Sequence, residues 1–164
     1  MTHETPADKT IAALERLLTD LGLEPERDET VAGFHIEFGA GVPVTTAFAA
    51  IAPDSQRFVF YINLGVNVEP AQRDEMSRLI TRVNWRLMVG SYDMDFDDGH
   101  VRFRMAIDFH DGELTENLMR NAILTAMNAI EAYAAALLSV AIGAQSAEQA
   151  IRAIEAAQSG HGRR

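Results

Sequence analysis

The chain has 164 residues, 48% hydrophobic and 23% charged, which suits one folded domain and excludes wholesale disorder. Its 24 acidic residues outnumber its 14 basic ones, and the formal net charge of −10 disfavours nucleic-acid binding. The absence of cysteine excludes disulfides, thiolate catalysis and Cys-ligated metal sites. We expect a single domain over residues 1–164, with flexible tails at residues 1–5 and 159–164.

The N-terminus, Met1-Thr2-His3-Glu4, lacks the basic and apolar regions of a secretory signal. The most apolar run, Ala132–Ala144, has about 13 residues, fewer than the ~20 that span a bilayer. These features predict a soluble cytoplasmic protein without a membrane segment.

The first predicted element is a helix over Pro6–Leu21, with Thr5 as its N-cap and Gly22 at its end. Its leucines and isoleucine recur at helical spacing. The acidic stretch Glu24–Thr30 reads as a loop. Three strands joined by short turns then predict an antiparallel meander: Phe34–Phe38, Val42–Ala52 and Arg57–Leu64.

A second helix is predicted over Pro70–Met88, and Gly90 breaks its pattern before a hairpin. Its buried stripe consists of apolar residues at helical spacing: Met76, Leu79, Ile80, Val83 and Leu87.

The hairpin is predicted to turn at Asp98-Gly99, which is a typical two-residue turn. In that register three apolar pairs share one side: Phe96 with Val101, Met94 with Phe103, and Tyr92 with Met105. Two opposite-charge pairs lie on the other side: Asp95 with Arg102, and Asp93 with Arg104.

A long helix is predicted over Leu114–Ile142, with Gly143 as its C′ residue. Ser146 and Gln149 form a capping box that begins a last helix, Ala147 to about Gln158. The apolar arc of the long helix approaches half its circumference. Either the sheet covers one flank and the last helix or a second subunit the other, or the helix is an intramolecular core helix. The order α-β-β-β-α-β-β-α-α predicts an α+β fold, an antiparallel sheet packed by helices.

No pattern in the chain predicts catalysis, metal binding or a cofactor. The stretch Asp93–Gly99 resembles a calcium loop, but neither possible register places Gly at position six and Glu at position twelve. The five histidines have no metal-ligand spacing, and no glycine-rich phosphate loop occurs. We therefore expect a protein that is not an enzyme, with no catalytic residue, metal or cofactor.

Trp85 is the only tryptophan, and helical spacing places it opposite the buried stripe of the second helix. Arg78, Arg82 and Arg86 form an i, i+4, i+8 ridge beside it. A tryptophan with arginines on an outer face is typical of interface hot spots. The alternative is that Trp85 packs against another part of the same chain. We predict a partner or homodimer interface made by Trp85, Arg78, Arg82, Arg86, Met88, Asp93 and Asp95.

Three segments carry a family resemblance: Val83–Asp95, Val101–Arg104 and Ile142–Ala150. The chain resembles the YbjN family, labelled "putative bacterial sensory transduction regulator", over residues 10 to 155. The matching positions are Asn84, Gly90, Tyr92, Tyr133, Gly143, Glu148 and Ala150. That family is similar in fold to the type III secretion chaperones, which are small, acidic, usually homodimeric proteins that bind other polypeptides.

The resemblance implies a type III secretion chaperone-like α+β fold and no catalytic residues. We expect a non-enzymatic protein–protein interaction module that binds itself as a homodimer and an unidentified protein partner, but neither nucleic acid nor membrane. The alternative is a small-ligand-binding regulatory domain, for which a large apolar cleft with convergent polar groups would be evidence.

Overall fold

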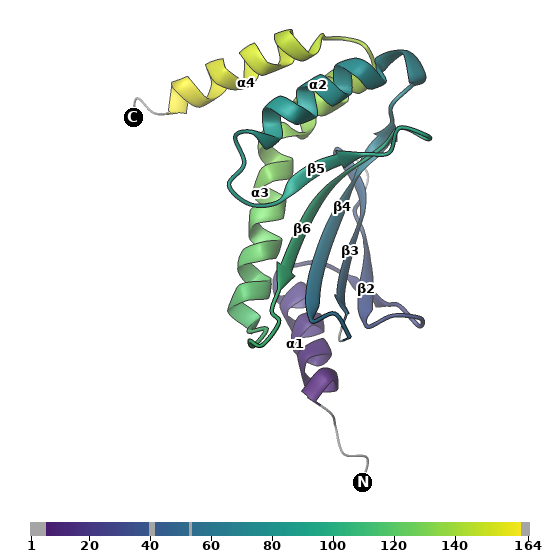
Figure 1. Cartoon of the computed structure of the whole chain (residues 1–164), viewed down its shortest axis with the longest axis vertical. Coiled ribbons are helices and arrows are strands. Elements are labelled where there is room, and N and C mark those ends of the chain that lie inside the picture. The colour runs from purple at the N-terminus through teal and green to yellow at the C-terminus, as the bar shows by residue number, and fades with distance from the viewer. Residues whose placement is uncertain (1–5, 40–41, 53, 162–164) are drawn as a thin grey trace.

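The computed structural model describes residues 6–39, 42–52 and 54–161, which form one antiparallel sheet and a set of helices (Figure 1). The sheet order is β1-β2-β3-β4-β6-β5. The predicted α+β class is confirmed. The elements are α1 (Pro6–Asp20), β1 (Pro25–Arg27), β2 (Gly33–Glu37), β3 (Val44–Ala52), β4 (Arg57–Asn67), the 3₁₀ helix η1 (Pro70–Gln72), α2 (Arg73–Asn84), β5 (Ser91–Met94), β6 (His100–Asp108), α3 (Glu116–Ala141) and α4 (Ala147–His161).

One strand lies where the sequence predicts a loop. The stretch Glu24–Thr30 contains β1, which pairs antiparallel with β2. The Asp28 side chain accepts hydrogen bonds from the backbone N–H groups of Thr30 and Val31 and so forms the turn between the two strands. The pairing of β1 therefore depends on this turn and on the backbone, and its own residues lack the alternation that predicts a strand.

The helices α1 and α3 lie on one face of the sheet, whereas α2 and α4 lie at one end of it (Figure 1). In β4 and β6 the buried residues alternate with exposed or half-buried ones, so one face of each strand builds the core. In β3 the alternation ends at Ala49, because Ala50 and Ile51 are buried as well. Every buried residue in the described part of the chain is apolar or a tyrosine. The core is thus a single apolar layer between sheet and helices.

The end of α3 and the start of α4 follow the predicted signals. Gly143 has a φ of +71° and ends α3, as a C′ glycine does. The capping box is confirmed, because Ser146 N–H donates to Gln149 Oε1 at 2.9 Å and Gln149 N–H donates to Ser146 Oγ at 3.3 Å. The helix α4 continues to His161, beyond the predicted end at Gln158. The predicted N-cap Thr5 and residues 1–5 and 162–164 lie outside the described residues.

The long helix α3 is long and apolar enough to cross a membrane by length and composition alone. In the fold it packs along β4 and β6, with α1, α2 and α4 also in contact with it. Its apolar arc is therefore wide because the sheet and three helices of the same chain cover it. Met119, Ile123, Leu137 and Val140 are completely buried, so α3 serves as the core helix of this fold.

The predicted register of the hairpin is wrong by two residues. The structure pairs Tyr92 with Phe103 and Asp93 with Arg102. The loop is longer than two residues, because Asp95 N–H donates to the His100 carbonyl and Gly99 N–H donates to the Asp95 carbonyl. A slip of two residues keeps each side chain on its predicted face, which is why both registers satisfy the same pattern. Phe96 moves from the core into the loop, where its exposed fraction is 52%.

Candidate protein-interaction surface

The helix α2 ends at Asn84, four residues before the predicted end at Met88. Its buried stripe is as predicted, with Met76, Leu79, Ile80 and Val83 in the core. Beyond Val83 the backbone tightens, because Arg86 N–H donates to the Val83 carbonyl and Leu87 N–H to the Asn84 carbonyl. Leu87 still packs against the core, so only part of the predicted helical phase continues through this turn.

Three apolar side chains protrude from the segment that connects α2 to β5. The exposed fractions are 90% for Trp85, 99% for Met88 and 56% for Val89. We call these three residues the loop patch. The predicted exposure of Trp85 is confirmed, and the alternative that Trp85 packs against its own chain is wrong. Exposed large apolar side chains that adjoin one another mark interaction sites more often than scattered ones do.

The three arginines of the predicted ridge have different environments. Arg78 donates to Glu75 within α2 at 3.2 Å, and Arg82 is exposed. Arg86 donates to Glu155 of α4. Because the helix ends at Asn84, Arg86 does not continue the ridge and instead joins two helices of the same chain. Beside it lies a groove of about 370 Å³ between α2 and α4, lined by Thr81, Arg82, Trp85, Arg86, Ile151 and Glu155.

The two predicted acidic residues of the interface belong to a different part of the structure. Asp93 accepts a hydrogen bond from Arg104 Nε at 2.8 Å and lies 3.7 Å from Arg102 Nε. The Asp95 carboxylate accepts the Asp97 N–H and so shapes the hairpin loop. The structure therefore leaves Trp85 and Met88 exposed on one segment but places Asp93 and Asp95 on the hairpin, where their partners are in the same chain.

Sequence patterns predicted neither the exposure of Val89 and Phe96 nor the pairing of Glu155 with Arg86. The periodicity of a helix predicts a side chain's direction only while the helix lasts, and Val89 follows its end. Glu155 lies 69 positions from Arg86 along the chain, so only the packing of α4 on α2 brings them together.

Some of the residues that carry the family resemblance fix the backbone directly after the loop patch. Gly90 has a φ of +73°, and a Cβ there would lie 2.4 Å from Phe103 Cζ. The Tyr92 hydroxyl donates to the Ala129 carbonyl of α3 at 2.8 Å, and burial raises the pKa of this phenol. The Tyr92 ring also meets Tyr133 edge-on, with centroids 6.3 Å apart. These contacts anchor the start of β5 to the core directly after the loop patch.

The described residues offer little for catalysis or metal binding. Within them, no three histidine, aspartate or glutamate side chains come together as a possible metal site. None of the polar or charged residues in the described ranges is buried, apart from tyrosines. What the arrangement can do is associate noncovalently, through apolar side chains with charged residues around them.

An antiparallel sheet with helices on one face and a protruding apolar loop defines a protein of the α+β class. The family model described as "Putative bacterial sensory transduction regulator" matches residues 10–139, so the chain belongs to the YbjN family. No curated protein matches the chain at a significant level.

Several solved structures are similar to this chain. The crystal structure of YbjN, "a putative transcription regulator from E. coli", aligns with a TM-score of 0.54 and 15% identity, over 73% of this chain and 87% of that one. The ExsC–ExsE complex aligns with a TM-score of 0.54 and 15% identity, over 80% of this chain and 96% of that one. The Yersinia pestis type III secretion chaperone SycH, in complex with a stable fragment of YscM2, aligns with a TM-score of 0.45 and 17% identity, over 73% of this chain and 96% of that one. At these identities the likeness concerns the fold.

Proposed function

We propose that this chain is a non-enzymatic, cytoplasmic protein–protein interaction module with a chaperone-like role, and that it forms a homodimer through the loop patch. The observation that carries the proposal is the exposure of Trp85, Met88 and Val89 on one short segment. Membership of the YbjN family and a structural neighbour that is itself a complex of two proteins support a role in protein binding.

A two-fold axis through the loop patch would use the same apolar residues twice, which suits a self-complementary interface. Burying an exposed tryptophan removes on the order of 200 Å² from water. Arg82 and the groove between α2 and α4 lie directly beside Trp85, so the indole of a second copy has an apolar recess and a cation within reach. The contribution of Asp93 and Asp95 to this interface is small, because both are engaged within the hairpin.

The alternative function, a small-ligand-binding regulatory domain, needs polar groups that converge on an enclosed apolar site. Apart from tyrosines, the described core holds no buried polar or charged residue that could orient such a ligand. This observation favours the interaction module over the ligand-binding domain.

The test is sedimentation velocity of the wild type and Trp85→Ala over a range of concentrations. We expect a wild-type dimer, and a dissociation constant raised by about 30-fold or more in Trp85→Ala, the size of a hot-spot residue. Leu124→Ala, which truncates a 40%-exposed leucine on α3, is the matched control and should leave the dimer intact. A wild-type monomer at high micromolar concentration would refute the dimer.

A further inference from the structure

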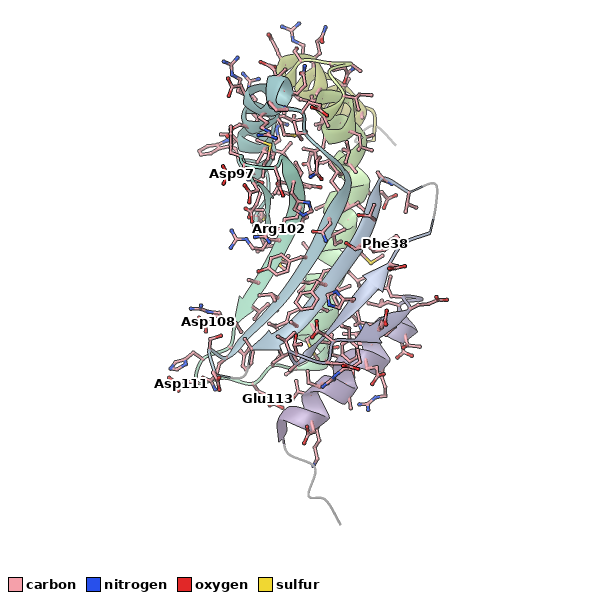
Figure 2. All side chains as sticks on the ribbon, turned by 90° about the vertical axis from the view of Figure 1, so that its right-hand side faces the viewer. Phe38, Asp97, Arg102, Asp108, Asp111 and Glu113 are labelled. Carbon is pink, nitrogen blue, oxygen red and sulfur yellow. The ribbon has the colours of Figure 1, made fainter. Side chains whose placement is uncertain are left out.

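The face of the sheet opposite α1 and α3 carries side chains that no helix covers in the described structure (Figures 1 and 2). We call it the open face. Its central row runs across four strands, because the register pairs His35 with Phe48, Phe48 with Tyr61, and Tyr61 with Arg104. The His35 and Phe48 rings are 4.8 Å apart, and the Arg102 guanidinium lies 4.5 Å from the Tyr61 ring centre. The row is thus a continuous strip of rings that ends on arginines.

The strip is flanked by a hollow at each end. The hairpin hollow, of about 630 Å³, is lined by Asp93, Asp95, Asp98, Arg102 and Arg104, among others. The β1 hollow, of about 480 Å³, lies around the edge formed by β1 and is lined by Glu24, Glu26, Glu37 and His35, among others. The two hollows lie beyond opposite ends of the same row of rings.

The charge in both hollows is negative. In the hairpin hollow three carboxylates face two guanidinium groups, and Asp93 binds both arginines. Asp95 and Asp98 each accept one backbone N–H, which leaves acceptor capacity on each carboxylate. In the β1 hollow three glutamates face only His35, and the His35 ring is hydrogen-bonded to Asp28. The open face therefore offers rings in the middle and carboxylates at both ends.

We propose that the open face binds a basic polypeptide segment in an extended conformation, laid across the strands, with one cationic side chain in each hollow and apolar side chains on Phe48 and Tyr61. The net charge of −10 likewise favours a positively charged partner and disfavours a nucleic acid. This surface is separate from the loop patch, so the proposal does not depend on the homodimer.

The spacing of the two cations follows from the sheet. From Glu37 of β2 to Asp93 of β5 the path crosses four strand-to-strand steps of about 4.8 Å, or roughly 19 Å in all. An extended chain advances about 3.3 Å per residue and points every second side chain to the same face, so the two basic residues of the partner lie about six positions apart. The residues between them lie over the rings.

The probe is the capped peptide Arg-Ala-Phe-Ala-Leu-Ala-Arg, titrated into the ¹⁵N-labelled full chain and followed by heteronuclear NMR. We expect amide shift changes in residues 46–50, 59–63 and 102–104, and weaker binding at high ionic strength, because screening reduces the attraction. Two control peptides replace both arginines by glutamate, or Phe and Leu by Gly and Ser, and both should bind less tightly.

Paired charge reversals locate the site. Glu26→Lys with Glu37→Lys should weaken peptide binding about tenfold or more, since repulsion replaces attraction in the β1 hollow. Glu113→Lys with Glu131→Lys makes the same change in net charge away from the two hollows and should leave binding within about twofold. Far-UV circular dichroism of each variant confirms the fold.

Four outcomes would overturn the proposal. These are no shift changes with the basic peptide, tighter binding of the glutamate peptide, equal effects of the two paired reversals, or shifts confined to residues 85–89. The last would assign the peptide to the loop patch and leave the proposed homodimer standing. Binding of oligothymidine to the open face in preference to the peptide would assign it to single-stranded nucleic acid instead.

Discussion

The side-chain amide of Asn84 forms two hydrogen bonds with the backbone of Tyr92: Asn84 Nδ2 donates to the Tyr92 carbonyl at 3.0 Å, and the Tyr92 N–H donates to Asn84 Oδ1 at 2.8 Å. Strand β5 is the edge strand of the sheet. Tyr92 and Phe103 form a non-hydrogen-bonded pair, so the backbone groups of Tyr92 point away from β6. Asn84 therefore takes the place of a neighbouring strand at this position and protects the edge.

The same pair of bonds brackets the loop patch. It joins the last residue of α2 to the second residue of β5, and the segment that carries Trp85, Met88 and Val89 lies between them. The exposed side chains are thus presented by a short segment that is fixed at both ends. A rigid presentation lowers the entropic cost of binding, which suits an interaction surface.

Asn84→Ala removes both hydrogen bonds and leaves two partly buried backbone groups without this partner. We expect a loss of about 1–3 kcal/mol in the free energy of unfolding, measured by urea denaturation. Asn128→Ala is the control, because Asn128 is exposed on α3 and should change stability little. A variant as stable as the wild type would show that water replaces the amide at no cost.

Gly90→Ala places a Cβ against the Phe103 ring at a positive φ. Strain at the left-handed backbone and the overpacked ring together predict a loss of about 2–4 kcal/mol. Thermal unfolding should show a lower Tm, and Gly39→Ala is the control, since a Cβ there meets no atom within 4 Å. Equal Tm values for the two variants would contradict the close approach.

Tyr92→Phe removes the buried hydrogen bond to Ala129 at a cost of about 1 kcal/mol near neutral pH. Burial raises the pKa of the Tyr92 phenol above its unfolded value of about 10. Folding therefore favours the protonated phenol, and this stabilisation is complete below about pH 10 and is lost as the pH rises further.

We accordingly expect the unfolding free energy of the wild type to fall more steeply above about pH 10 than that of Tyr92→Phe. Tyr61→Phe, which changes a half-buried tyrosine of the open face, is the matched control and should follow the wild-type curve. Parallel curves for the wild type and Tyr92→Phe would argue against a buried, neutral phenol.

We expect acid to lower the stability of the fold through protonation of Asp28. Hydrogen bonds from the Thr30 side chain and backbone, His35 and Val31 hold the pKa of the Asp28 carboxyl well below its usual range. The stabilisation is present above the unfolded pKa of about 4 and is lost as the pH falls below it.

The variant Asp28→Asn measures this effect, because it keeps the shape of the side chain but not the charge. The Tm difference between wild type and Asp28→Asn should be largest near neutral pH and shrink in acid, as the wild-type carboxyl becomes protonated. Asp54→Asn, at an exposed position in the turn between β3 and β4, should show no such difference. A pH-independent difference would mean that the Asp28 charge is not involved.

Local patterns predicted much of the fold because their signals act over a few residues. The capping box at Ser146, the C′ glycine at Gly143 and the buried stripe of α2 each depend on neighbours along the chain, and the structure confirms all three. The exposure of Trp85 was predictable for the same reason, since it follows the phase of the helix that precedes it.

The hairpin shows what local sequence patterns cannot predict. Alternation determines which face a strand residue takes, but a shift of two residues preserves every face, so the sequence pattern could not distinguish the two registers. The hydrogen bonds of the loop and the pairing of β6 with β4 select the observed one.

By itself, then, the sequence determined the α+β class, the element order apart from β1 and the exposure of Trp85, because each follows from periodicity or from local residue chemistry, and it indicated the family through a resemblance of three segments. The tertiary structure alone decided where α2 ends, that Arg86 binds Glu155, and that one face of the sheet remains open. These features depend on contacts between segments that are far apart in the sequence. Such contacts form only when the core packs, so local sequence patterns do not predict them.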